Sequence, residues 1–347
     1  MAQASDTAGD ATGAAFARRL RNSLLALGLL VVAIAALLNS LPGLSEIDRL
    51  VTHASSGWLA LAVGLEYLSC TGYVLTVLLA FPRGRARPTV RLAWSELAAN
   101  AVLPAGGLGG LGLGAWILTR RGVPSSRIAV RSTVVFLLTS AASIAALVIV
   151  GVGLWLGIFD GTRRFTLTLL PAAVGVAAVL GTIGGAAWAE HAAESTRHRR
   201  TARAFGSLAA GIRATLSELA HPDWKLSGAI AYFAFDVATL GATFAAIGHT
   251  PPLATMVMAY LIGQLAGLIP IPGGLGAVEG GLVGALTVYG VKLSHATAAV
   301  LLYRAISLLL PAILGTIAFL ILRRDLDKPL VLRPQNTTVD AVASDDP

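Results

Sequence analysis

Five charged side chains lie inside stretches that are otherwise apolar: Glu66, Glu96, Asp236, Glu279 and Arg304. Charges at membrane depth are costly, so such residues usually face a protein interior or a water-filled cavity. Glu279 lies at the predicted start of a helix, where an anion is favoured, and Arg304 lies on the same outer half of the next segment. A pair between them would lower the cost of both charges. The sequence leaves two roles open for this pair: a buried structural contact, or direct contact with a substrate or a coupling proton.

The other acidic residues also have two interpretations each. Glu66 and Asp236 are each the lone acidic residue in the second predicted helix of one half of the chain. Each one either forms hydrogen bonds internally, or the two form a symmetric proton-responsive pair. Glu96 and Asn100 lie one helical turn apart. They either line the inner mouth of a cavity, or Glu96 lies at the membrane interface with its carboxylate in water.

Two runs of glycine and proline interrupt the segments that carry these residues. Proline removes a helix donor and glycine weakens a helix, so each segment is expected to form two half-helices. The exposed backbone amides at such breaks suit an anion such as a phosphate or a carboxylate. The residues are Pro104, Gly106, Gly107 and Gly109 in the first run, and Pro270, Pro272, Gly273, Gly274 and Gly276 in the second.

The composition is that of an all-α polytopic membrane protein. Of the 347 residues, 55% are hydrophobic and 13% are charged, and the mean hydropathy is +0.75. The charged fraction is about half that of a soluble domain. Apolar segments able to enter a bilayer lie at about 24–38, 57–80, 93–119, 128–158, 165–189, 226–248, 253–290 and 296–322.

Known catalytic patterns are missing from the sequence. A single cysteine, Cys70, allows no intramolecular disulfide, and the six histidines are scattered. We therefore expect no metal site and no cofactor. The sequence also contains neither a phosphate-binding loop nor the residue spacing of a hydrolase, so we expect the chain not to be an enzyme.

The positive charges predict an orientation. Segment 93–119 is too short for two crossings and is predicted to be re-entrant, while 253–290 is either re-entrant or a tight hairpin. Six full crossings then remain, and both termini face the cytoplasm as tails of residues 1–23 and 323–347. This topology puts 21 of the 26 Lys and Arg residues inside, including all four arginines of 120–131, and four outside. The positive-inside rule strongly favours that distribution.

The two broken segments are similar to each other. Their shared elements are Gly-Gly-Leu-Gly at 106–109 and 273–276, and Gly-Val at 122–123 and 290–291. Because each half has three full crossings, an odd number, the second half must be inverted relative to the first. We therefore predict an inverted repeat of residues 24–158 and 159–322. Inverted repeats with broken helices are typical of transporters.

Between the halves, the sequence predicts an amphipathic helix at about 202–220. Its apolar residues recur every three or four positions and an arginine-rich run precedes it. This pattern favours a helix lying on the anionic inner leaflet. The chain has 23 arginines and three lysines, with abundant alanine and glycine, which suggests a GC-rich bacterial genome. Helical spans then predict a place in the inner (plasma) membrane. A pI near 10.2 then reflects cytoplasmic loops and not a nucleic-acid partner.

The motifs resemble a known family. The run Pro272 to Gly276 with Glu279, followed by Gly290-Val291 and Leu301-Leu302-Tyr303-Arg304, is similar to the second motif of the lysylphosphatidylglycerol synthase transmembrane-region family, or flippase-like membrane proteins. Asn100, Pro104 and the following glycines match the first motif. The resemblance covers about residues 20–325.

In full-length synthases the resembling region moves aminoacylated phosphatidylglycerol between leaflets, and a separate soluble domain makes that lipid. The resemblance therefore implies a stand-alone flippase-like module without synthase activity. Relatives often carry a charged pair in the helix after the first motif, but here residues 134–137 are apolar.

Three functions stay open on the sequence. The first is translocation of a phospholipid, aminoacylated or anionic, or of a related envelope lipid. The second is transport of a small soluble anion on the same scaffold. The third is a non-catalytic role as the membrane partner of a separately encoded envelope-modifying enzyme. The sequence does not give the oligomeric state.

Overall fold

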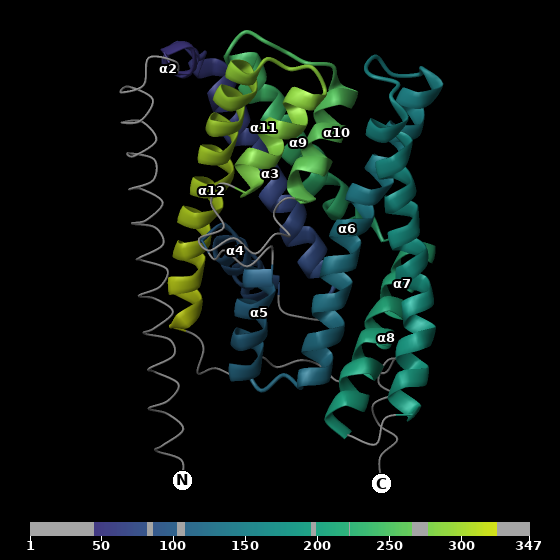
Figure 1. Cartoon of the computed structure of the whole chain (residues 1–347). Helices are drawn as coiled ribbons and strands as arrows, with labels where there is room; N and C mark the ends of the chain where they lie inside the picture. Colours follow the sequence, from purple (N-terminus) through teal and green to yellow (C-terminus); the bar gives the residue numbers. More distant parts are fainter. Residues whose placement is uncertain are drawn as a thin grey trace.

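The computed structural model describes residues 45–81, 86–102, 108–195, 199–221, 223–265 and 277–324. All regular elements within these ranges are helices (Figure 1). Five of them are long and apolar enough to cross a membrane: α3 (Ser56–Leu79), α6 (Ser125–Leu156), α7 (Leu169–Ser195), α9 (Ser227–Ala246) and α12 (Leu293–Arg323). The prediction of an all-α multi-pass membrane protein is therefore confirmed. The predicted first crossing at 24–38 and most of both tails lie outside the described residues.

Each broken segment consists of two helices, as predicted. These are α4 (Ala86–Val102) with α5 (Leu108–Arg120), and α10 (Leu253–Leu265) with α11 (Ala277–Val288). The partners of each pair pack together, with α10 and α11 in the upper part of Figure 1 and α5 in the lower part. Helices of 12 or 13 residues are about 18–20 Å long, so α5, α10 and α11 are too short to cross a hydrocarbon core of about 30 Å. Of the motif glycines and prolines, only Gly109 falls within the described residues.

The repeated Gly-Val pair has the same local structure in both halves. Gly122 ends α5 and Gly290 ends α11, each with a positive φ, 75° and 94° respectively. The N–H of the following valine then donates to a carbonyl five residues back: Val123 to Leu118, and Val291 to Leu286, both at 3.0 Å. This is the Schellman C-cap, in which glycine avoids the cost of a left-handed backbone and the valine packs on the last turn.

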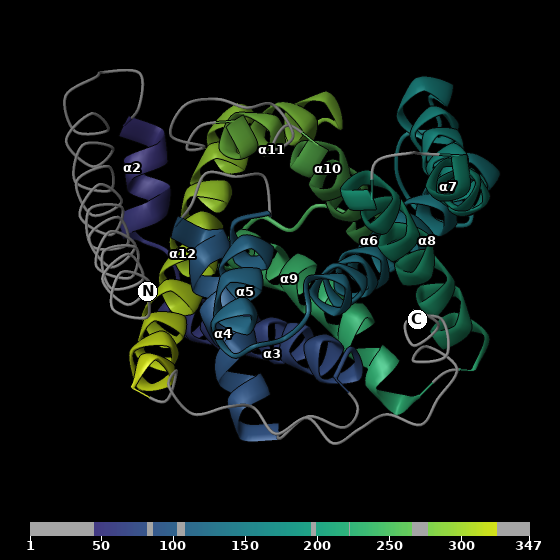
Figure 2. The ribbon, with the colours of Figure 1, turned by 90° about the horizontal axis from the view of Figure 1, so that it is seen from below.

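The crossing of α3 and α9 joins the two halves of the chain at its centre (Figure 2). The helices are antiparallel, since the N–H of Ser55 donates to the carbonyl of Ala246 at 2.8 Å. Gly72 and Gly228 meet where the helices are closest. A Cβ atom added to Gly72 would lie 2.5 Å from the Tyr232 nitrogen and 2.6 Å from the Gly228 oxygen. Only glycine permits this backbone approach.

The predicted helix between the halves is present as α8 (Arg199–Ala220). It lies beside α7 and also packs against α6 (Figure 1). Ala209 and Ile212 of its apolar face are buried, while Leu208, Leu216 and Leu219 are exposed. The apolar face of α8, which the sequence predicts to lie on the inner leaflet, is therefore partly covered by other helices of the protein. The described chain also has a short helix that we did not predict, α2 (Ser45–Thr52), which packs on α12.

The glycine contact predicts the effect of substitutions along α3. Gly72→Ala should destabilise the folded protein by about 1–3 kcal/mol, because α3 and α9 must move apart to admit the methyl group. Gly64→Ala is the matched control: it is in the same helix, and an added Cβ there meets no atom within 4 Å. The apparent melting temperature in detergent should fall for Gly72→Ala only. Equal melting temperatures for the two variants would contradict this description of the crossing.

Candidate functional site

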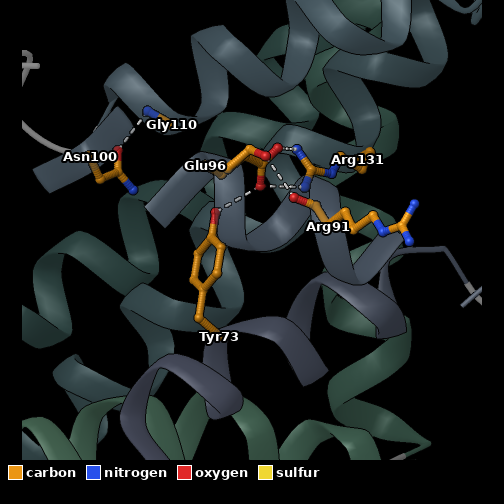
Figure 3. Close-up of polar contacts among 7 residues, drawn as sticks. Tyr73, Arg91, Glu96, Asn100, Gly110 and Arg131 are labelled. Atoms are coloured by element: carbon orange, nitrogen blue, oxygen red, sulfur yellow. Dashed lines mark hydrogen bonds and ion pairs between the residues drawn. The ribbon is translucent and has the colours of Figure 1, made fainter. Parts of the chain in front are cut away.

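One buried ion pair holds α4 against α6. Glu96 of α4 accepts hydrogen bonds from both terminal nitrogens of Arg131 in α6, at 2.5 and 2.7 Å. The hydroxyl of Tyr73 in α3 donates to the same carboxylate at 3.0 Å (Figure 3). Glu96 is 0% exposed and Arg131 is 3% exposed. The interpretation that placed the Glu96 carboxylate in water at the membrane interface is therefore wrong, since its oxygens are enclosed by protein donors.

Next to this ion pair, Asn100 ties α4 to α5. Its side-chain oxygen accepts the N–H of Gly110 at 2.7 Å, across the break between the two helices (Figure 3). Gly114 of α5 lies directly over the Glu96 carboxylate, where an added Cβ would overlap Oε1. Because Gly114 has no side chain, α5 leaves space for the ion pair. Glu96 and Asn100 position the first hairpin in this arrangement.

The prediction that Arg131 is an inside loop charge is wrong. This residue lies in the second turn of α6 and is buried. The sequence contains a signal for this position, because Arg131 interrupts an apolar run that begins at Ile128. The predicted orientation does not depend on Arg131, since the other inside arginines and lysines still greatly outnumber those outside.

The second ion pair is the one that the sequence predicted. Glu279 lies in the first turn of α11, and Arg304 lies in α12. The Arg304 Nε atom donates to Glu279 Oε1 at 2.6 Å. The two side chains are 17% and 21% exposed, unlike the enclosed pair of Glu96 and Arg131.

The α3–α9 crossing brings the other two acidic residues together. Asp236 accepts hydrogen bonds from the hydroxyl of Tyr303, at 2.8 Å, and from that of Tyr260. Glu66 is 5% exposed and accepts a weak bond from the Cys70 thiol at 3.7 Å. Glu66 and Asp236 are electrostatic neighbours of each other, and Arg304 acts on both of them. Both interpretations drawn from the sequence thus stay open: each carboxyl has internal hydrogen-bond partners, and the two are also close enough to act on each other.

The predicted residues thus fall into two groups. Glu96 and Asn100 belong to the first hairpin, with Arg131 and Tyr73 as partners. The second group links both helices of the crossing to the second hairpin, and its members are Glu66, Asp236, Tyr260, Glu279, Tyr303 and Arg304. The sequence alone did not indicate Tyr73 or Tyr260, and it gave Tyr303 a place in the second motif but no role. In the described ranges, no group of three or more His, Cys, Asp or Glu residues could hold a metal ion.

Comparison with known proteins identifies the family of the chain. The profile of the family described as "Lysylphosphatidylglycerol synthase TM region" matches residues 24–315, most of the chain and both hairpins. The chain belongs to this family. The resemblance drawn from the motifs of the lysylphosphatidylglycerol synthase TM region is therefore confirmed.

Two relatives of the chain are known as UPF0104 membrane proteins. The one from Methanothermobacter thermautotrophicus is 39% identical over 87 residues, which are 25% of this chain and 25% of the relative. The one from Methanocaldococcus jannaschii is 33% identical over 97 residues, 28% of this chain and 29% of the relative. The matched part is thus between a quarter and a third of each relative's length, and their names state a membrane protein without an activity.

The space above Glu96 gives a prediction within α5. Gly114→Ala should displace the Glu96 carboxylate from Arg131 and destabilise the protein by about 1–3 kcal/mol. Gly112→Ala, two residues away, meets no atom within 4 Å and should gain up to about 1 kcal/mol from better helix propensity. Thermal unfolding in detergent separates the two variants. A Gly114→Ala protein as stable as Gly112→Ala would refute the close contact.

The enclosed ion pair predicts a double-mutant result. Arg131→Met should cost about 3–5 kcal/mol, because it leaves the Glu96 carboxylate buried without a counter-ion. Adding Glu96→Gln removes that charge and should recover a large part of the loss. Denaturant unfolding of the two single variants and the double variant measures the coupling. Simple additivity of the two substitutions would show that the residues do not interact.

Proposed function

We propose that the protein is a transporter that moves a lipid with an anionic headgroup, such as a phospholipid or an aminoacylated phospholipid, between membrane leaflets. The observation that supports this most directly is the partly exposed pair of Glu279 and Arg304 at the start of α11. The other buried pair, Glu96 with Arg131, is enclosed by protein, with side chains 0% and 2% exposed. Residual access to a charged pair between apolar helices suits a ligand that replaces one partner.

Arg304 has the chemistry for a phosphate. A guanidinium group carries five N–H donors in a fixed plane, of which a carboxylate takes at most two. A phosphodiester could therefore bind beside Glu279 or replace it on Arg304. The positive end of the α11 helix dipole also favours an anion at this position. The acyl chains of such a lipid would stay in the bilayer against the exposed apolar faces of the spans.

We also propose that the scaffold is an inverted repeat with six full crossings. The supporting observations are the paired Schellman turns at Gly122 and Gly290 and the packing of the helices. If α3 to α6 correspond to α9 to α12, the contact of α4 with α12 corresponds to that of α10 with α6, and both contacts occur. Repeats of this kind rock against each other in transporters. Cytoplasmic termini and a bacterial inner membrane complete this proposal.

The proposal assigns no enzymatic activity to the chain. Membrane lipids are its proposed ligands, and a separately encoded enzyme that modifies envelope lipids or glycans is a proposed partner. If the protein serves only as such a partner, it should co-purify with the enzyme and move no lipid when reconstituted alone. If it transports a small anion instead, it should take up that solute irrespective of the lipid composition.

Reconstitution in liposomes tests lipid translocation. Fluorescent phosphatidylglycerol should move between leaflets in wild-type proteoliposomes, as measured by dithionite quenching of the outer-leaflet signal. Arg304→Ala should slow this movement about 10- to 150-fold, the range that corresponds to losing one charged hydrogen bond of about 1.5–3 kcal/mol. Glu279→Ala should slow it as well, since Arg304 then loses its orientation.

The matched control is Arg213→Ala. Arg213 also forms an ion pair, with Glu190 at 2.5 Å, but its side chain is 52% exposed on α8. Removing it should leave translocation within about twofold of wild type, because exposed ion pairs contribute little. Wild-type rates in Arg304→Ala, with protein correctly inserted, would refute the proposed role of the Glu279–Arg304 pair.

A further inference from the structure

We propose that Glu66 and Asp236 form a proton-binding site, and that a proton shared between them couples the relative position of the two halves to transport. The site itself rests on the geometry of the α3–α9 crossing. Only the coupling rests on the proposed transport function. The ligand is a proton, and its receptor is a pair of carboxyl groups contributed by the two halves of the chain.

A buried oxygen of Glu66 lacks a hydrogen bond. Glu66 is 5% exposed, and its Oε2 atom has no hydrogen-bond partner. The register of the antiparallel helices puts Asp236 opposite Glu66, since one turn further along α3 the hydroxyl of Ser69 donates to the carbonyl of Tyr232 at 2.8 Å. Two ionised carboxylates have no donor between them, so neither can satisfy the other. One shared proton supplies the donor that the buried oxygen needs.

The carboxyls around the pair outnumber the cations. The ionisable groups that face it are Cys70 from α3, Tyr232 from α9, Tyr260 from α10, and Tyr303 and Arg304 from α12, with Glu279 of α11 bound to Arg304. Among these described groups there is one cation, Arg304, for three carboxyls. Full ionisation would leave two negative charges without a counter-ion between apolar helices, which is strongly unfavourable.

The pair of carboxyls connects the two halves of the chain. Glu66 belongs to α3 in the first half, and Asp236 belongs to α9 in the second. Two carboxyls hold a common proton tightly when they are close and release it when they separate. Any movement of one half against the other changes their separation. Proton binding and the position of the halves are therefore linked reciprocally.

Asp236 is the more exposed of the two carboxyls, since it is part-buried whereas Glu66 is 5% exposed. The hydroxyls of Tyr260 and Tyr303 both contact Asp236. A proton arriving from water can bind Asp236 first and then be shared with Glu66, and no covalent bond other than O–H forms or breaks.

Infrared difference spectroscopy tests the site without reference to transport. Purified wild-type protein at pH 7 should show the carbonyl stretch of a protonated carboxylic acid, separated from the carboxylate and amide bands. Glu66→Gln and Asp236→Asn should each remove or shift this band, and both are close in shape to the native residue. The control is Glu194→Gln, which replaces an exposed residue of α7 and should leave the band unchanged.

The pH dependence of translocation tests the coupling. Wild-type proteoliposomes should change their rate up to about tenfold per pH unit where one protonation state limits transport. Glu66→Gln imitates a permanently protonated carboxyl, so its rate should vary less than about twofold over the same range. Asp236→Asn gives an independent reading if Glu66→Gln does not fold.

The outcomes distinguish the two proposals. A wild-type protein without the acid band, or a band that persists in both variants, overturns the proton site. A band that behaves as expected, together with translocation that is independent of pH, overturns the coupling. If no lipid moves at any pH but the band disappears in the variants, the proton site is supported and the proposed transport function fails.

Discussion

The crossing of α3 and α9 is the contact on which the rest of the structure depends. Gly72 and Gly228 remove the side chains that would keep the two backbones apart. This close approach places Glu66 beside Asp236, although 170 positions separate them in the sequence. Each of the two helices also packs against the first helix of the hairpin in its own half, α3 against α4 and α9 against α10. The rings of Tyr73 and Tyr232 contact each other across the crossing, with 5.5 Å between their centres. The close packing of the two helices therefore also fixes the positions of the two buried carboxyl groups.

The two ion pairs show how the same chemistry serves different ends. Glu96 and Arg131 use both oxygens and both terminal nitrogens, a tyrosine completes the set, and the surrounding helices exclude solvent. Such a pair contributes specificity to the arrangement of α4, α5 and α6 more than net stability. Glu279 and Arg304 form a single described bond at the edge of a break, with access from outside. In the proposed function, the less enclosed pair is the one that exchanges a partner for the headgroup of a lipid.

The sequence predicted the helices and the broken segments well, because long apolar runs and proline-glycine interruptions act locally. It also predicted the pair of Glu279 with Arg304, since both positions could be assigned to one half of the membrane from helix boundaries alone. Arg131 was misplaced because counting charges treats every arginine near a helix end as solvated. Only the fold brings the Glu96 carboxylate of α4 opposite it. The tyrosine partners of Asp236 come from α10 and α12, so no local spacing could reveal them.

The lengths of the short helices have a consequence for the thickness of the permeability barrier. A 13-residue α5 is about 20 Å long and a 12-residue α11 about 18 Å, against a hydrocarbon core of about 30 Å. In the proposed inverted repeat the two hairpins enter from opposite faces, and with these lengths they would overlap near the midplane by about 8 Å. A charged headgroup that followed the hairpins would cross only a thin barrier near the midplane, and most of the transmembrane voltage would fall across this barrier. The free energy of moving one elementary charge through it would then change by about 2.3 kcal/mol per 100 mV. The proposed transport of an anionic lipid would therefore be electrogenic.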